Sequence, residues 1–124
     1  FFLQAHPAIA DPLWSRGLGD VYKRQYADNR SCAVSATGHG EYFIRHTVAR
    51  DICARMQFGG ATLEEAANTV VMEELIEADG EGGIVAVDPA GRVALIFNTP
   101  GMYRASIDAT GHKVVGIYGE DETP

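Results

Sequence analysis

The sequence predicts an α+β fold in the order strand, helix, helix, strand, strand, strand. Two amphipathic helical patterns are followed by short β-branched runs, an order typical of α+β proteins and not of a doubly wound parallel sheet. The 124 residues fit one domain, and the hydrophobic (46%) and charged (22%) shares are those of an ordinary globular protein. We therefore expect a single packed core.

The first 25 residues do not resemble the rest of the chain. Residues 1–25 show neither a helical nor an alternating apolar period, and prolines and glycines interrupt any element that starts there. The stretch 11–25 also resembles a translated sequencing-adapter artefact that recurs at the ends of metagenomic gene fragments. We interpret residues 1–25 as an irregular, non-native leader and residues 26–124 as the domain.

One strand and two helices are predicted first. Residues 31–37 alternate as a strand does, with Cys32, Val34 and Ala36 on one side. A helix over Glu41–Met56 is indicated by apolar residues at helical spacing, followed by a glycine pair. These apolar residues are Ile44, Val48, Ile52 and Met56, with Ala49 and Cys53 beside them.

The second helix begins at a capping box. In Thr62-Leu63-Glu64-Glu65 the Thr62 side chain can accept from the Glu65 amide while the Glu65 carboxylate reaches back to the cap. The helix is predicted from about Leu63 to Ala78. Its inward residues are predicted to be Leu63, Ala67, Val70, Val71 and Leu75.

The last three elements are strands. The β-branched runs 84–87 and 93–97 flank Asp88-Pro89-Ala90-Gly91, whose proline and glycine positions favour a type I turn and therefore a hairpin. Residues 114–118 are predicted as a final edge strand.

Composition narrows the class of partner. The net charge of −7, without clustered Lys or Arg, argues against nucleic acid and against an anionic membrane. No apolar run approaches the roughly 20 residues needed to span a bilayer. A small-molecule or peptide partner is expected, with a cytoplasmic location as the default.

No cofactor or metal is predicted. Cys32 and Cys53 lack the C-x-x-C spacing of a redox or zinc motif, so they are expected to be reduced, buried thiols. The four histidines form no ligand spacing. Ser106, Asp108 and His112 lie in a predicted loop that would not orient them as a catalytic group.

The turn Thr37-Gly38-His39-Gly40-Glu41 is the strongest candidate site. It joins a predicted strand to a predicted helix, where unpaired amides and two glycines form a concave set of donors. Such a turn can hold an anion or a developing oxyanion. The alternative is that the glycines only allow a sharp turn. Nucleotide-binding fingerprints fail because Phe43 stands where a third glycine is needed.

Several blocks of the sequence resemble a known family. Tyr26-Ala27-Asp28-Asn29, then residues 33–41, then Phe97-Asn98-Thr99-Pro100-Gly101-Met102-Tyr103-Arg104-Ala105, are similar to the isoaspartyl peptidase branch of the plant-type L-asparaginases. These are N-terminal-nucleophile (Ntn) hydrolases with an αββα sandwich. The resemblance covers residues 26 to about 118 and implies a partial αββα sandwich, a fragment of the nucleophile-bearing β subunit.

The resemblance also implies roles for three residues. Thr37 matches the threonine whose hydroxyl stabilises the oxyanion, and Gly38 matches the glycine whose amide is the second donor. Gly40 matches a glycine that lines the pocket for the substrate's α-amino and α-carboxylate groups. His39 is read as a turn residue, and the segment 101–104 is assigned to packing around the pocket or at a dimer interface.

The family's nucleophile is absent from this sequence. The mature family subunit is released by autoproteolysis and begins with Thr-Val-Gly-Ala, which does not occur here. The family's binding arginine and aspartate belong to a G-R-V-G-D-S-P-like loop, and Arg16 and Asp20 do not match its spacing. The chain alone is therefore expected to be inactive.

Two functions remain open from the sequence. The first is a part of a threonine-nucleophile amidohydrolase acting on L-asparagine or β-aspartyl dipeptides, in a family that assembles as a dimer of processed heterodimers. The second is a non-catalytic α+β module that binds an anionic ligand at the Gly38 to Gly40 turn. The sequence does not separate asparagine from isoaspartyl dipeptides as the preferred substrate.

Overall fold

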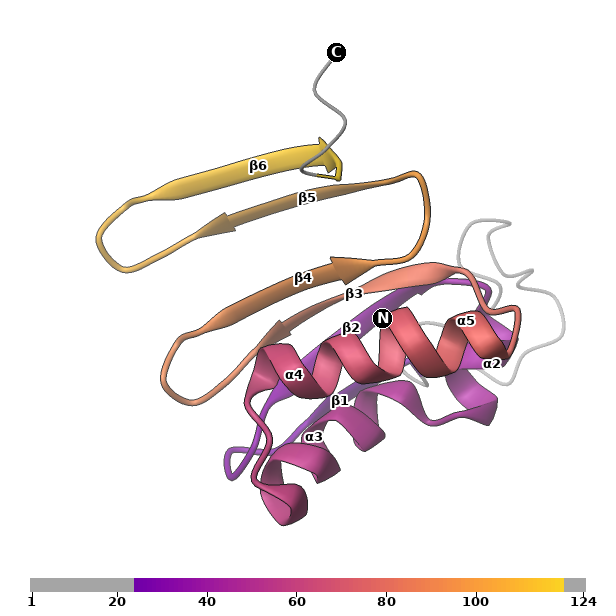
Figure 1. The fold of residues 1–124 in the computed structure, drawn as a ribbon. Coiled ribbons are helices and arrows are strands. Elements are labelled where there is room, and N and C mark those ends of the chain that lie inside the picture. The colour runs from indigo at the N-terminus through magenta and orange to yellow at the C-terminus, as the bar shows by residue number, and fades with distance from the viewer. Residues whose placement is uncertain (1–23, 120–124) are drawn as a thin grey trace, which may run out of the picture.

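A computed structural model describes residues 24–119 and shows a helical layer on one face of an antiparallel sheet (Figure 1). The sheet has four strands in the order β1-β2-β3-β4, and a separate two-stranded hairpin, β5-β6, follows it. The strands are β1 (Gln25–Ala27), β2 (Ala33–Gly38), β3 (Gly82–Val87), β4 (Val93–Phe97), β5 (Gly101–Ile107) and β6 (Lys113–Tyr118). The helices are α2 (Gly40–Arg45), α3 (Val48–Gly59), α4 (Leu63–Asn68), the π-helix η1 (Thr69–Glu74) and α5 (Leu75–Glu77).

The α+β prediction is confirmed. The order is strand, helices, strands, and every strand pair in the described part is antiparallel. Residues 1–23 and 120–124 lie outside the described residues, and with them most of the predicted leader. Strand pairing already begins at Gln25, opposite Ser35. The irregular segment predicted over residues 1–25 therefore overlaps β1 at its last residue.

The core lies between the helices and one face of the sheet. Residues alternate along a strand, so Val34, Ile84 and Ala94 point to the helices and are buried. Register places Ala36 opposite Ile84, and Ile84 opposite Ile96. The remaining core comes from the helices, with Phe43, Val48, Ile52, Leu63, Ala66, Ala67, Val70, Val71 and Leu75 buried.

The first predicted helix is divided in two. The prediction of one helix over Glu41–Met56 is wrong because Thr47 adopts a left-handed conformation, with φ of +47°. The break changes which residues face inward before it. Phe43 is buried at 2% exposure, whereas Ile44, predicted to be inward, is 39% exposed. After the break, Val48 and Ile52 are buried as predicted.

The second helix begins as predicted. The Thr62 hydroxyl accepts from the Glu65 amide at 3.2 Å, and the Thr62 amide donates to the Glu65 carboxylate at 2.9 Å. All five predicted inward residues are buried. The middle of the helix widens into the π-helix η1, in which the Leu75 amide bonds to the carbonyl of Val70, five residues back. That widening was not predicted.

Both hairpins close with the same kind of turn. The Gly91 amide donates to the Asp88 carbonyl at 3.0 Å, as the predicted turn requires. The Gly111 amide donates to the Asp108 carbonyl at the same distance in the second hairpin. The predicted final strand is β6, and its partner β5 was missed, so Ser106 lies in a strand rather than the predicted loop.

The prediction of two reduced thiols is wrong in this structure. Cys32 and Cys53 form a disulfide, with Cα atoms 5.4 Å apart and 21 residues between them in sequence. It joins the residue before β2 to the middle of α3, and both cysteines are buried. The pairing was not visible in the sequence because it depends on how α3 packs against β2.

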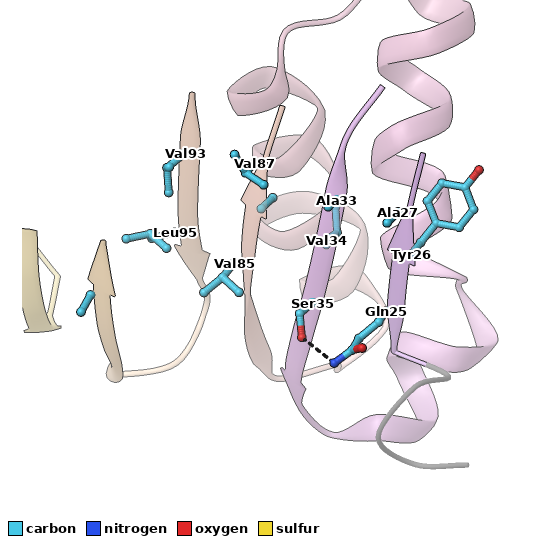
Figure 2. A pocket seen from close by; sticks show the side chains of 12 residues that line it. Gln25, Tyr26, Ala27, Ala33, Val34, Ser35, Val85, Val87, Val93 and Leu95 are labelled. Carbon is cyan, nitrogen blue, oxygen red and sulfur yellow. Dashed lines mark hydrogen bonds between the residues drawn. The ribbon is translucent and has the colours of Figure 1, made fainter. Parts of the chain in front are cut away.

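The face of the sheet opposite the helices is apolar and open (Figure 2). Val85, Val87 and Val93 are 44%, 41% and 50% exposed. With Ala33, Leu95 and their neighbours they line a shallow concavity of about 600 Å³. Among residues 24–119 no helix is long and apolar enough to cross a membrane.

Candidate functional site

The candidate site lies where β2 ends and α2 begins. Thr37 and Gly38 are the last two residues of β2, and Gly40 is the first residue of α2. Thr37 and Gly38 are exposed, and Gly40 is half-buried. The three residues implied by the family resemblance are therefore adjacent and accessible in this part of the chain.

The Thr37 side chain lies on the face of the sheet that the helices do not cover. Val34 and Ala36 point to the helical core, so alternation directs Ser35 and Thr37 to the opposite face. Among residues 24–119 the Thr37 hydroxyl has no hydrogen-bond partner. Its cross-strand neighbour is Gly83, and the Met102 sulfur fills the space beside Gly83, yet Thr37 itself is exposed. The hydroxyl is thus free to donate to a bound group.

The Gly38 amide points away from β3. The amide of Gly82, opposite Gly38, donates to Asn98 Oδ1 at 2.8 Å, and the Gly82 carbonyl accepts from the Asn98 amide at 3.0 Å. Both polar backbone groups of Gly82 thus face β4. In an antiparallel ladder a residue directs both groups to one side, so Gly38 and Gly82 form a non-hydrogen-bonded pair.

The neighbouring residues agree with this geometry. The His39 amide donates to the Glu81 carbonyl at 2.9 Å, which is the next hydrogen-bonded step towards β3. The Ala36 amide donates to the Arg24 carbonyl at 3.2 Å, on the β1 side. The Gly38 carbonyl accepts from Arg24 Nη1 at 3.3 Å. Gly38 therefore presents its amide on the β1 side of the strand end.

Close contact between two glycines determines the shape of the turn. Gly38 has φ of +130° and Gly82 has φ of +156°. A Cβ atom on Gly38 would collide with the backbone of Glu81 and Gly82, and one on Gly82 would collide with the Thr37 carbonyl and the Phe43 ring. Both positions therefore require glycine.

The other predicted residues have simpler roles. His39 is the residue before α2, and its exposed ring lies 6.3 Å from that of Tyr42. Asp108 Oδ1 accepts from the Thr110 and His112 amides, at 2.9 and 3.0 Å. Asp108 is therefore a turn residue, and its carboxylate binds backbone amides instead of forming a dyad with the His112 side chain beside Ser106. Met102 of the segment 101–104 is buried, as expected for packing.

The apolar concavity on the helix-free face does not include the three candidate residues. Its lining is mostly Ala, Val and Leu together with Tyr26, and Gln25 Nε2 donates to Ser35 Oγ at 3.3 Å (Figure 2). A surface of this composition suits packing against another layer better than orienting a polar substrate. No cluster of three or more metal-ligating side chains occurs within residues 24–119.

The missed residue at this site is Asn98. It lay inside a sequence block that resembles the family, but neither its spacing nor its type indicated a contact with Gly82. That contact exists because β4 ends beside the start of β3. Only the register of the two strands reveals it.

Comparison of the sequence with known proteins identifies its family. The asparaginase family profile, described as "Asparaginase", matches residues 24–117. The isoaspartyl peptidase of Escherichia coli K12 is 54% identical over 95 residues, covering 77% of this chain and 30% of that protein. The isoaspartyl peptidase of Salmonella typhimurium is 53% identical over 95 residues, which again cover 77% of this chain and 30% of that protein. The isoaspartyl peptidase/L-asparaginase of Danio rerio is 40% identical over 74 residues, covering 60% of this chain and 24% of that protein.

The chain thus spans less than a third of the length of these relatives. The matched region coincides with the described elements, from β1 almost to the end of β6. Its fold is that of an α+β part of an Ntn-hydrolase-type domain. The chain belongs to the asparaginase family of isoaspartyl peptidases and L-asparaginases.

Proposed function

We propose that this chain is the carboxy-terminal part of the nucleophile-bearing subunit of an amidohydrolase. Its substrates would be L-asparagine, β-aspartyl dipeptides, or both. The proposal is supported by the identity of 54% to an isoaspartyl peptidase. The observation that carries it is the pair of donors at the end of β2, an exposed Thr37 hydroxyl and a Gly38 amide directed away from β3.

The two donors suit acyl transfer. A threonine hydroxyl supplied from outside this chain would attack the side-chain carbonyl carbon, with its own α-amino group accepting the proton. The carbonyl oxygen then gains negative charge. Thr37 Oγ1 and the Gly38 amide would each donate a hydrogen bond to that oxygen, worth roughly 3 kcal/mol per donor. Gly40 would leave room for the substrate's α-amino and α-carboxylate groups.

The open face of the sheet supports the proposal that this chain is part of a larger domain. Val85, Val87 and Val93 expose apolar surface that a packed second sheet would cover. An αββα sandwich requires such a second sheet, contributed by residues beyond those described here. We propose that this face is the inner surface of the sandwich and that the full assembly is a dimer of processed heterodimers.

A second function is favoured by one feature of the turn. Within residues 24–119 the amides of Gly40 and Glu41 have no backbone or side-chain acceptor, as expected at a helix start. A non-catalytic module could bind an anion there without any nucleophile. Extending the gene upstream separates the two, because the enzyme requires Thr-Val-Gly-Ala followed by a G-R-V-G-D-like loop.

The activity test uses the full-length precursor that contains this sequence. Thr37→Ala should lower kcat by roughly 10²-fold or more and change KM less, because the hydroxyl acts mainly where charge develops. Ser35→Ala is the matched control, since Ser35 lies two residues earlier on the same face and its hydroxyl is engaged by Gln25. Ammonia release from asparagine and dipeptide cleavage are the measurements.

The 124-residue chain by itself should release no ammonia from asparagine, because it lacks both nucleophile and binding arginine. Turnover by this chain would show that the nucleophile has been misplaced. A fully active Thr37→Ala precursor would show that the turn is structural.

A further inference from the structure

The Asn98 side chain bonds to three backbone positions behind the candidate site. Its Oδ1 accepts from the Gly82 amide at 2.8 Å. Its Nδ2 donates to the Gly80 carbonyl at 2.8 Å and to the Val71 carbonyl at 3.1 Å. One half-buried side chain therefore connects the start of β3, the loop just before it and the π-helix η1.

The side-chain amide is suited to this position. The Asn98 backbone amide already donates to the Gly82 carbonyl, and Oδ1 then takes the Gly82 amide, so the side chain extends the β3–β4 ladder by one step. Its two N–H groups are left for two carbonyls. An aspartate would keep the acceptor and lose both donors. Alanine would lose all three bonds.

The π-helix supplies one of these carbonyls. At the end of η1 the Leu75 amide reaches back to Val70. The next carbonyl, that of Val71, accepts from Asn98. Val71 is fully buried, so removing this bond takes a donor away from a buried carbonyl, which is costly. Asn98 is therefore bonded directly to the wide turn of the helix.

Gly82 lies between Asn98 and the candidate site and connects the two. Gly82 lies opposite Gly38 in the register, and neither position has room for a Cβ atom. The two backbones are thus in direct contact, and Gly38 cannot move towards β3 unless Gly82 moves. Asn98 holds Gly82 from the other side.

We propose that Asn98 is a positioning residue for the oxyanion site, acting on the Gly38 amide through Gly82. This role depends on the proposed function of Gly38 as a donor. Catalytic donors must be held within about 0.5 Å of the productive geometry. A displacement of about 1 Å can lower the rate roughly 10²-fold. Asn98 does not need to touch the substrate to have this effect.

The structural part of the proposal is tested in the 124-residue chain by amide hydrogen exchange. Asn98→Asp and Asn98→Ala should speed exchange of the His39 amide, which bonds to Glu81 beside Gly38, by about tenfold or more, a local loss of about 1.4 kcal/mol. The Asp108 amide in the second hairpin and the Ala66 amide at the start of α4 should exchange as in the unsubstituted chain. Asn98→Asp retains the acceptor for the Gly82 amide but places a carboxylate oxygen against the Gly80 and Val71 carbonyls, so it removes the same two donors in a different way.

Asn68→Ala is the matched control. Asn68 Nδ2 also donates to a helix carbonyl, that of Glu64 at 3.0 Å, but this bond is exposed and makes no contact with Gly82. It should leave His39 exchange unchanged. Equal exchange of His39 in the Asn68→Ala and Asn98→Ala chains would overturn the proposal.

The catalytic part is tested in the full-length precursor, with kcat expressed per folded molecule. Asn98→Ala, which removes the acceptor for the Gly82 amide, should lower kcat by about tenfold or more while KM changes by less than about threefold, with Asn98→Asp as the second variant. A residue with only a structural role would lower the folded fraction and leave this normalised kcat unchanged, and that result would overturn the positioning role. If Thr37→Ala is fully active, the proposed function of the turn fails, whereas the His39 exchange result still decides whether Asn98 holds the turn.

Discussion

The two hairpins of this chain have the same turn and opposite environments. In both, an aspartate carbonyl accepts from the glycine three residues on, and the aspartate Oδ1 accepts from the amides two and four residues on. The glycines have φ of +82° at Gly91 and +85° at Gly111. Yet β3–β4 packs against the helices, whereas β5–β6 exposes apolar side chains at Tyr103, Ile107, Val115 and Ile117.

The difference shows that a turn motif does not determine how much its hairpin contributes to the stability of the fold. The aspartate, glycine and strand pattern are enough to form either turn. Whether the strands then contribute to stability depends on what covers them. Substitutions at matched positions in the two hairpins, or in the layers beneath them, test this dependence in the 124-residue chain.

The largest difference is expected between two strand side chains. Ile84 of β3 is fully buried, so Ile84→Ala should lower the free energy of unfolding by about 2–5 kcal/mol through lost burial and the cavity left behind. Val115 of β6 is 77% exposed, so Val115→Ala should change it by less than about 0.5 kcal/mol. Urea unfolding measures both. A large loss for Val115→Ala would mean that another surface covers the second hairpin.

The disulfide should stabilise only the layer that contains the first hairpin. Cys32 and Cys53 close a loop with a sequence separation of 21, for which chain entropy gives a stabilisation of about 3 kcal/mol. Cys32→Ala combined with Cys53→Ala should lower the unfolding midpoint, and a reductant should lower it only in the unsubstituted chain. Mass measurement after thiol alkylation counts the free thiols directly.

That count also bears on the compartment. Disulfides persist in oxidising environments and are rare in the cytosol. The cytoplasmic location expected by default would therefore favour the dithiol form. Two free thiols in freshly purified chain, with no change in stability on adding reductant, would contradict the disulfide.

The turn aspartates should differ in their acid dependence. Burial raises the pKa of the Asp88 carboxyl, but hydrogen bonds from the Arg92 amide, its guanidinium and the Ala90 amide outweigh burial and hold that pKa below its ordinary value. A carboxyl with a depressed folded pKa adds stability above its unfolded pKa of about 4 and loses it as pH falls through the folded pKa. The Asp88 side chain is only 1% exposed.

Asp88→Ala should therefore lower the free energy of unfolding at neutral pH by about 1–3 kcal/mol, because two amides lose a buried acceptor. It should also reduce the loss of stability between about pH 5 and pH 3. Asp108→Ala is the matched substitution, and its effect should be smaller because the hydrogen bonds of Asp108 are exposed, whereas those of Asp88 are part-buried. Unfolding curves at several pH values test this, and equal effects at the two turns would contradict it.

The smallest difference in unfolding free energy between two matched substitutions is expected at the turn glycines. Gly91→Ala and Gly111→Ala place a side chain at positive φ, and no atom lies within 4 Å of the added Cβ at either position. Only backbone strain remains, worth roughly 1–2 kcal/mol in each case. The two losses should agree to within about 0.5 kcal/mol. A clear difference would show that the environment of the hairpin also changes the cost of its turn.

Elements with a strong local signal were predictable from the sequence. The capping box at Thr62 and Glu65, the turn at Asp88 to Gly91 and the inward face of the second helix follow from bonds between near neighbours and from periodicity. The break at Thr47 was not predictable, because the apolar period continues across it. Strand β5 was missed because its pattern is weak and its partner β6 comes later in the chain.

For the candidate site, too, some features were predictable from the sequence and others were not. Sequence alone located the turn, since a strand pattern, two glycines and a helix pattern lie in succession, and the family resemblance assigned roles to Thr37, Gly38 and Gly40. It could not show the direction of the Gly38 amide, which depends on the pairing of Gly82 with Asn98. The functional roles of these residues stay predictions.

By itself, the sequence determined the fold class, the family and the position of the glycine turn. These follow from local patterns that act over a few residues and from a resemblance that spans most of the chain. Only the tertiary structure decided the disulfide, the contact of Asn98 with Gly82 and which hairpin is covered. Each of these joins segments that are distant in the sequence, and such contacts arise only when the sheet register and the helix packing bring the segments together.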